Sequence, residues 1–202
     1  MTALSSYLCS VFNVDSLDIV SNELLSGGAI QENRALDIQL PNGSLKQLVL
    51  RSDAPSSVSA SLSRRQEFAA LAVAFDSGVT VPEPIAYCDD ISIIGKRFFL
   101  MTRLPGAAQP IHITRACAAN TSQCEQLTQT LGHELAMIHA IPLEDPRIRF
   151  ITEDIDKQQP VLKQRLDTYE TYLNALDIKR PVLQWTIAGL RDKNVPTDET
   201  CF

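Results

Sequence analysis

The chain has 202 residues, 45% of them hydrophobic and 21% charged, a composition typical of a soluble globular protein with one larger domain or two lobes. Its net charge of −6 argues against nonspecific nucleic-acid binding, which needs a basic surface to neutralise phosphates. The five cysteines form no C-x-x-C pair, and neither a signal-peptide pattern nor a membrane-length apolar run is present, so we expect reduced thiols, a cytoplasmic location and no membrane partner.

The first part of the chain combines a short helix with a paired-strand pattern. The helix carries four apolar residues on one face, Leu4, Tyr7, Leu8 and Val11. A Gly27-Gly28 turn then leads into a strand whose apolar residues, Leu36, Ile38 and Leu40, alternate with polar ones. A turn at Asn42-Gly43, where both residues suit positive φ, returns the chain along a strand that ends on the cation Arg51.

The next element is a helix predicted over residues 63–75. Ser63 with Gln66 three residues later forms a capping-box pattern, and Gly78 suits the end of the helix. Glu67 lies in the first turn beside the apolar stripe. From there Glu67 is within reach of Arg51, the cation that ends the preceding strand.

A stiff connection, residues 79–84, leads into the following strand. After a turn at Gly95, residues 98–101 form an apolar β-prone run, which predicts a buried strand that leaves the sheet at Thr102. We expect this exit to expose the backbone amides and carbonyls of residues 102–104 at the mouth of a cleft.

After Pro105 the pattern becomes helical. Residues 107–121 are polar, small and aperiodic, and predict a loop or short helix over the cleft. Three helices should follow, opened by a capping box at Ser122 and Glu125, by Pro160 and by Pro181. Their apolar stripes are Leu127, Leu131, Leu135 and Ile138, with Pro142 ending that helix, then Leu162, Leu166, Tyr169 and Leu173, and then Leu183, Ile187 and Leu190.

In this order the segments resemble the aminoglycoside phosphotransferase and choline kinase-like family of small-molecule kinases. They are most similar to the hydroxy-acid-kinase-type branch, some members of which are fused to acyl-CoA dehydrogenases. The matching pieces are Gly27-Gly28, the V-L-R strand end at 49–51, Glu67, the V-P-E-P connection at 81–84, the segment from Phe98 to Gly106, and the later helices at 131–140 and 180–185. The resemblance spans nearly the whole chain.

The resemblance implies an α+β, protein-kinase-like fold. Residues 1–105 would form an antiparallel-sheet, nucleotide-binding small lobe with its hinge at 101–105, and residues 106–202 the first helices of an incomplete large lobe. It implies ATP with Mg²⁺ as cofactor and a small-molecule hydroxyl as acceptor. The implied nucleotide-binding residues are Gly27, Gly28, Arg51, Glu67, Met101, Thr102 and Leu104, with Met101 behind the adenine and with Thr102 and Leu104 contacting it through main-chain groups.

The family's His-Gly-Asp loop, whose Asp is the catalytic base, is absent from the 202 residues. The expectation is therefore an N-terminal fragment of a phosphotransferase, with the catalytic Asp and the magnesium ligands beyond Phe202 and no transfer by this chain alone. Helices deprived of packing partners would expose apolar stripes and favour dimerisation or aggregation.

Each functional interpretation has a structural alternative. Arg51 and Glu67 can form an inconsequential surface ion pair, and Gly27-Gly28 an ordinary hairpin turn. His133 and His139 stand six residues apart, on different faces of a helix, so we expect no metal site. At the level of function, the alternative to an enzyme fragment is a non-catalytic nucleotide-binding or interaction module that keeps the small lobe.

Overall fold

The computed structural model describes residues 2–25, 31–53, 61–106, 110–153, 156, 159–176 and 178–192. The chain forms two compact units, Met1–Ile148 and Arg149–Phe202. None of the helices in the described ranges has the length and apolarity needed to cross a membrane.

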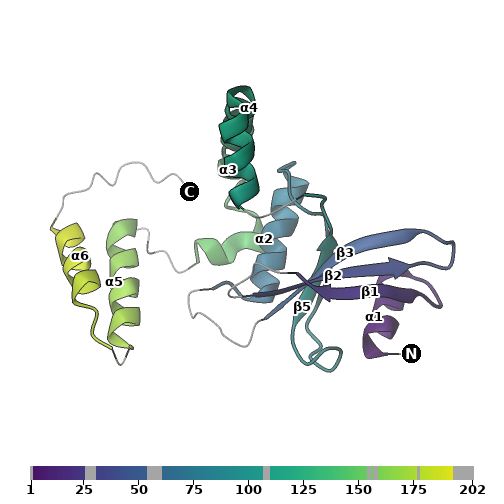
Figure 1. Ribbon diagram of the computed structural model, residues 1–202. Coiled ribbons are helices and arrows are strands. Elements are labelled where there is room, and N and C mark those ends of the chain that lie inside the picture. Colours follow the sequence, from purple (N-terminus) through teal and green to yellow (C-terminus); the bar gives the residue numbers. More distant parts are fainter. Residues whose placement is uncertain are drawn as a thin grey trace. The chain divides into compact units, whose positions relative to one another are not determined.

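The first unit is built on a five-stranded sheet with the strand order β1-β2-β3-β5-β4 (Figure 1). Every pair of neighbouring strands is antiparallel. The strands are β1 (Asp18–Leu24), β2 (Gln31–Gln39), β3 (Leu45–Asp53), β4 (Pro84–Cys88) and β5 (Phe98–Thr102). The predicted antiparallel sheet and the α+β class, an arrangement consistent with a kinase-like fold, are confirmed.

The β2–β3 turn differs in one detail from the prediction. Gly43 has a positive φ of 82°, as expected, but Asn42 does not share it. Instead the Asn42 side-chain oxygen accepts hydrogen bonds from the Ser44 amide and hydroxyl, at 3.0 and 2.7 Å. The asparagine therefore stabilises the turn through its side chain, as asparagines in turns often do.

One face of the sheet packs on helix α1 (Ala3–Phe12). Because side chains alternate between faces along a strand, every second residue of β2, β3 and β5 points toward this helix. The buried residues of this core are Leu4 and Leu8 of the helix with Leu36, Ile38, Leu48, Leu50, Phe98 and Leu100 of the sheet and Cys88. Tyr7 meets the Phe98 ring edge-on at 5.3 Å. Burial, followed by the neighbouring Cys88, raises the pKa of Tyr7 to about 12.

Helix α2 (Arg64–Asp76) packs against β4 and β5. Its capping box is confirmed, since Ser63 accepts from the Gln66 amide and Gln66 accepts from the Ser63 amide. At the other end, Gly78 takes φ 81°, its amide bonds to the Phe75 carbonyl, and the Val79 amide bonds to the Ala74 carbonyl. This pair of bonds is the Schellman arrangement, which needs a residue in the left-handed region.

The rest of the described chain is almost entirely helical, as predicted. The helices are α3 (Pro110–Ala119), α4 (Thr121–His139), the 3₁₀ helix η1 (Pro146–Ile151), α5 (Val161–Asn174) and α6 (Pro181–Arg191). The predicted capping box at Ser122 and Glu125 is wrong, because the N-cap lies two residues earlier, at Asn120, whose side chain accepts from the Gln123 amide. Pro160 was predicted in the first turn of its helix, but it lies one residue before α5, at the N-cap position, and makes no side-chain hydrogen bond there.

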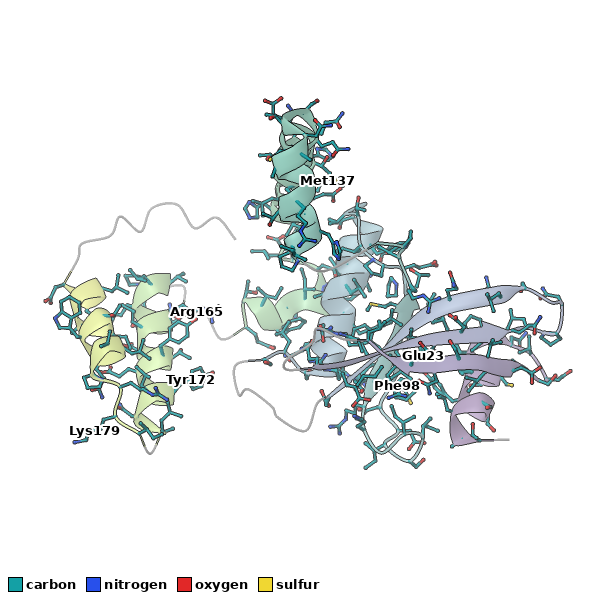
Figure 2. The ribbon with its side chains drawn as sticks, viewed as in Figure 1. Glu23, Phe98, Met137, Arg165, Tyr172 and Lys179 are labelled. Atoms are coloured by element: carbon teal, nitrogen blue, oxygen red, sulfur yellow. The ribbon has the colours of Figure 1, made fainter. Side chains whose placement is uncertain are left out.

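The α4 stripe lies largely in solvent, and Figure 2 shows side chains projecting from this helix. Leu131, Leu135 and Ile138 are 60%, 52% and 47% exposed. One contact from α4 and one from η1 connect these helices to the C-terminal end of α2 and the residues that follow it. The Glu134 carboxylate accepts from the Thr80 amide and hydroxyl, at 2.9 and 2.6 Å, and Arg147 pairs with Asp76 at 2.5 Å. The two hydrogen bonds from Thr80 lower the pKa of Glu134 below its ordinary value.

The second unit contains α5 and α6, which pack on each other. Leu166 and Ile187 are their buried residues, as the stripes predicted. Tyr169, predicted on the buried face, is exposed instead. Arg191 of α6 pairs with Asp167 and Glu170 of α5, at 2.6 Å each.

Candidate functional site

The face of the sheet opposite α1 carries two of the predicted site residues, Arg51 of β3 and Met101 of β5. Ala35, Val49 and Met101 are cross-strand partners, and together they form an apolar row. Ala35 and Val49 are buried, and Met101 is half-buried. One pleat further along β3 lies the next row on this face, made of Asn33, Arg51 and Phe99.

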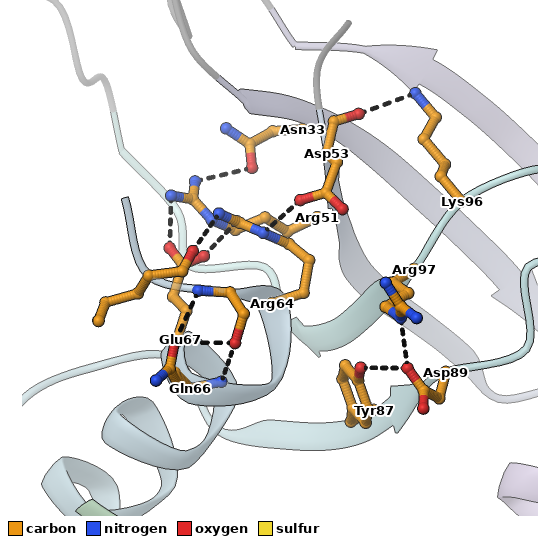
Figure 3. Close-up of polar contacts among 12 residues, drawn as sticks. Asn33, Arg51, Asp53, Arg64, Gln66, Glu67, Tyr87, Asp89, Lys96 and Arg97 are labelled. Carbon is orange, nitrogen blue, oxygen red and sulfur yellow. Dashed lines mark hydrogen bonds and ion pairs between the residues drawn. The ribbon is translucent and has the colours of Figure 1, made fainter. Parts of the chain in front are cut away.

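Arg51 is clamped from two elements (Figure 3). Its Nη2 lies 2.5 Å from Glu67 Oε1 of α2, and its Nη1 donates to Asn33 Oδ1 of β2 at 3.0 Å. The predicted Arg51–Glu67 ion pair is therefore present. The side chains of Arg51 and Glu67 are 22% and 25% exposed, so the pair lies half-buried beside the sheet rather than free in solvent.

Helix α2 is positioned for this contact by aromatic packing. The Phe68 ring lies 5.7 Å from Phe99 and 6.2 Å from Tyr87, measured between centroids. Because Phe68 follows Glu67 directly, its packing on β4 and β5 holds the first turn of α2 near the end of β3.

Arg64 also binds Glu67, and the sequence did not single it out. Its Nη1 pairs with Glu67 Oε2, and its Nε lies 2.9 Å from Asp53 Oδ1 at the end of β3. The available signal was its position three residues before Glu67, where helical side chains are neighbours. Asn33 gave no comparable signal, because its contact depends on the register of β2 on β3.

Lys96 holds the end of β3 from the loop before β5. Its Nζ donates to the Asp53 carbonyl at 3.2 Å and pairs with Glu32 at 2.7 Å. The hydrogen bond from Lys96 lowers the pKa of Glu32. The backbone that carries Asp53 is thus fixed independently of Arg64.

At the end of β5, the backbone amides of residues 102–104 were predicted to be exposed, and one of the three, that of Leu104, is free of a partner among the residues that the structure describes. The Thr102 amide donates to the Glu83 carbonyl at 2.9 Å, and the Arg103 amide to the Gln47 carbonyl at 3.0 Å. The Leu104 amide donates to no acceptor within the described ranges. Antiparallel pairing with the two neighbouring strands explains the difference, because the chain leaves the sheet one residue later than predicted.

Two side chains hold this exit in place. The Thr102 hydroxyl accepts a hydrogen bond from the Glu83 amide at 2.9 Å. Arg103 pairs with Asp37 of β2 at 2.8 Å. Both contacts join residues far apart in sequence.

The remaining predicted residues, Gly27 and Gly28, lie outside the described residues. In the part of the chain that the structure describes, no group of three or more His, Cys, Asp or Glu side chains is arranged to hold a metal ion.

Comparison with known proteins shows which family the chain matches. The model of the phosphotransferase enzyme family (APH) matches residues 23–202. No curated protein matches the chain. Among solved structures, a "putative aminoglycoside phosphotransferase" from Ralstonia eutropha JMP134 is similar, with 20% sequence identity and a TM-score of 0.39. That match covers 53% of this chain and 28% of the other, and at this level it carries no argument about activity.

Proposed function

Because this chain belongs to the phosphotransferase enzyme family, we propose that the sheet face opposite α1 binds ATP for phosphoryl transfer to a hydroxyl of a small molecule. The observation that carries the proposal is the Arg51–Glu67 pair, which stands on the same face as the apolar row of Ala35, Val49 and Met101. An apolar row beside an oriented cation suits a base joined to phosphates.

The adenine would lie against the apolar row. Met101 would stand behind it, and the Thr102 carbonyl and the Leu104 amide would bind its polar edge. Support comes from the Leu104 amide, which donates to nothing among the described residues, and from the two contacts that fix the β5 exit. Main-chain groups held in this way need no ordering when the base binds, which favours affinity.

The phosphates would lie toward Arg51 and the Gly27-Gly28 turn. Asn33 and Glu67 each hold one terminal nitrogen of Arg51, so the planar guanidinium is oriented before a phosphate arrives. Arginine offers phosphate a fork of N–H donors where a lysine offers a point charge. Arg51 would orient the α- and β-phosphates.

Transfer itself needs groups that we do not find in this sequence. No His-Gly-Asp occurs in the 202 residues, and the described side chains form no metal cluster. We therefore propose that this chain corresponds to the N-terminal portion of a phosphotransferase and is inactive alone. On the motifs at 49–51 and 81–84, we assign it to the hydroxy-acid-kinase-type branch.

The proposal is tested first by nucleotide binding. Isothermal titration of the chain with ATP should show weak binding that Arg51→Met weakens by about tenfold or more, because a charge-assisted phosphate contact is lost. The matched control is Arg97→Met, since Arg97 is an exposed arginine whose partner is Asp89, at 2.6 Å. It should leave the affinity unchanged.

The second test is turnover. Phosphoryl transfer to a panel of hydroxyl-bearing small molecules should be absent for this chain and present in a form extended through an H-G-D-x-x-x-x-N loop. Turnover by the short chain, above that of an Arg51→Met, Glu67→Gln double variant, contradicts the proposal. Nucleotide binding without turnover by the extended form would favour the non-catalytic module.

A further inference from the structure

Arg64 is the one charged residue that is buried in the described ranges. Its side chain is 3% exposed. A buried guanidinium is costly unless its charge is paired and its N–H groups are hydrogen-bonded. Arg64 pairs its charge with two carboxylates, Glu67 on its own helix and Asp53 at the end of β3 (Figure 3), although its Nε makes no hydrogen bond among the described residues.

The two oxygens of Glu67 are divided between two arginines. Oε2 pairs with Arg64 and Oε1 with Arg51. A carboxylate held by one oxygen cannot rotate without breaking that contact. Arg64 therefore fixes the direction in which Glu67 presents its other oxygen to Arg51.

We propose that Arg64 is a positioning residue of the phosphate site, which acts through Glu67 to hold the guanidinium of Arg51 in its phosphate-binding orientation. The inference rests on the proposed function and deepens it. Arg64 does not itself contact the nucleotide in this arrangement, because its Nη1 donates to Glu67, its Nη2 donates to the Leu62 carbonyl and its Nε lies beside Asp53.

Charge balance supports the same role. Arg51 and Arg64 together neutralise Glu67 and Asp53. Without Arg64, this cluster would lose one positive charge, and the more negative surroundings would oppose an incoming phosphate. The contribution is therefore electrostatic as well as geometric.

Helix stability alone does not account for Arg64. It is the first residue of α2, where the helix dipole disfavours a positive charge. The capping box of Ser63 and Gln66 already satisfies the amides of this end. Within this first turn, the feature specific to Arg64 is its link from Glu67 to Asp53.

The test compares Arg64→Met and Arg64→Lys with a matched control, Arg147→Met. Arg147 also bridges two carboxylates, Asp76 at the other end of α2 and Asp145, at 2.5 and 2.8 Å. Removing it breaks an ion-pair contact of the same helix without touching the Arg51 cluster. Arg64→Lys serves if Arg64→Met fails to fold, because one ammonium cannot hold both carboxylates as the arginine fork does.

The first readout is the arginine side-chain NMR spectrum of the full chain without nucleotide. Slow rotation of the Arg51 guanidinium should give separately resolved Nη signals in the original chain and in Arg147→Met. Both Arg64 variants should lose this resolution. If the Arg51 signals are the same in the Arg64 variants as in the original chain, the positioning role is wrong.

The second readout is the preference for ADP over adenosine, which isolates the phosphate contribution. It should fall about tenfold in Arg64→Met and by less in Arg64→Lys, and stay constant in Arg147→Met. An original chain that does not prefer ADP would contradict the proposed function, while the NMR readout would still decide the role of Arg64. A preference unchanged by both Arg64 substitutions would overturn the inference.

Discussion

Thr102 joins two strands at the β5 exit through separate atoms. Its amide donates to the Glu83 carbonyl and its hydroxyl accepts from the Glu83 amide, both at 2.9 Å. The proposed adenine contact uses neither atom, since it is made by the Thr102 carbonyl. The side chain of this residue therefore affects the stability of the exit and not the recognition of the base.

The corresponding prediction separates stability from binding. Thr102→Ala should lower the free energy of unfolding by about 1 kcal/mol, because the Glu83 amide loses its acceptor, and should barely change nucleotide affinity. Thr102→Ser should retain both properties. Urea unfolding and isothermal titration measure the two quantities.

A bulky substitution at Gly28 should have the opposite effect in the isothermal titration. Gly28→Leu should obstruct the phosphates and weaken binding. Loss of binding in Thr102→Ala together with retained binding in Gly28→Leu would show that the exit of β5 is not the adenine site.

At the scale of the element, helix α2 carries Glu67, the partner of Arg51, on its first turn. The stability of the helix also depends on how its C-terminal end is formed. Gly78 sets that end with a φ of 81°. A Cβ at Gly78 would also lie 3.4 Å from Met137 Cε of α4.

Two glycine substitutions should therefore have opposite effects on stability. Gly78→Ala should destabilise the chain by about 1–2 kcal/mol, because an L-residue is strained in the left-handed region. Gly132→Ala, inside α4 with no atom within 4 Å of the added Cβ, should stabilise it by up to about 1 kcal/mol. Thermal and urea unfolding test both, and equal signs for the two changes would contradict the assigned backbone conformations.

At the scale of the whole molecule, helix α4 leaves an apolar stripe exposed. Leu131, Leu135 and Ile138 recur at helical spacing on α4 and are each about half exposed or more. Exposed apolar stripes of this kind favour association. This is the physical basis for expecting the chain to dimerise or aggregate.

Association should depend on that stripe. Sedimentation velocity over a range of concentrations should show self-association, and the double variant Leu131→Gln, Leu135→Gln should reduce it. The control is Val20→Gln, which removes an apolar side chain of β1 that is 59% exposed. A chain that stays monomeric throughout, or a control that acts as strongly as the double variant, would refute the role of α4.

The two compact units are defined by packing, whereas the division predicted at residue 105 is defined by nucleotide binding. The boundary between the two compact units falls between Ile148 and Arg149 along the chain, so α3 and α4 are in the same unit as the sheet. The bonds of Glu134 to Thr80 and of Arg147 to Asp76 account for this grouping. The predicted boundary concerns nucleotide binding and stays a prediction.

The sequence by itself determined what depends on neighbours along the chain. The strand alternation of β2, the capping box of α2 and the glycine at its end are all local patterns, and each was confirmed. The Arg51–Glu67 pair was also predicted, because Arg51 was placed at a strand end and Glu67 in the first turn of the next helix. The predicted strand end was wrong by two residues, since β3 continues to Asp53.

Tertiary structure alone decided what depends on register and packing. Strand pairing brings Asn33 to Arg51, and the packing of α2 against β4 and β5 places Arg64 between two carboxylates. The partner of the Thr102 hydroxyl is Glu83, the residue before β4. The exposure of the α4 stripe and of Tyr169 also depends on which surfaces find partners. Local periodicity shows that a helix has an apolar face, but only the three-dimensional arrangement decides what, if anything, covers it.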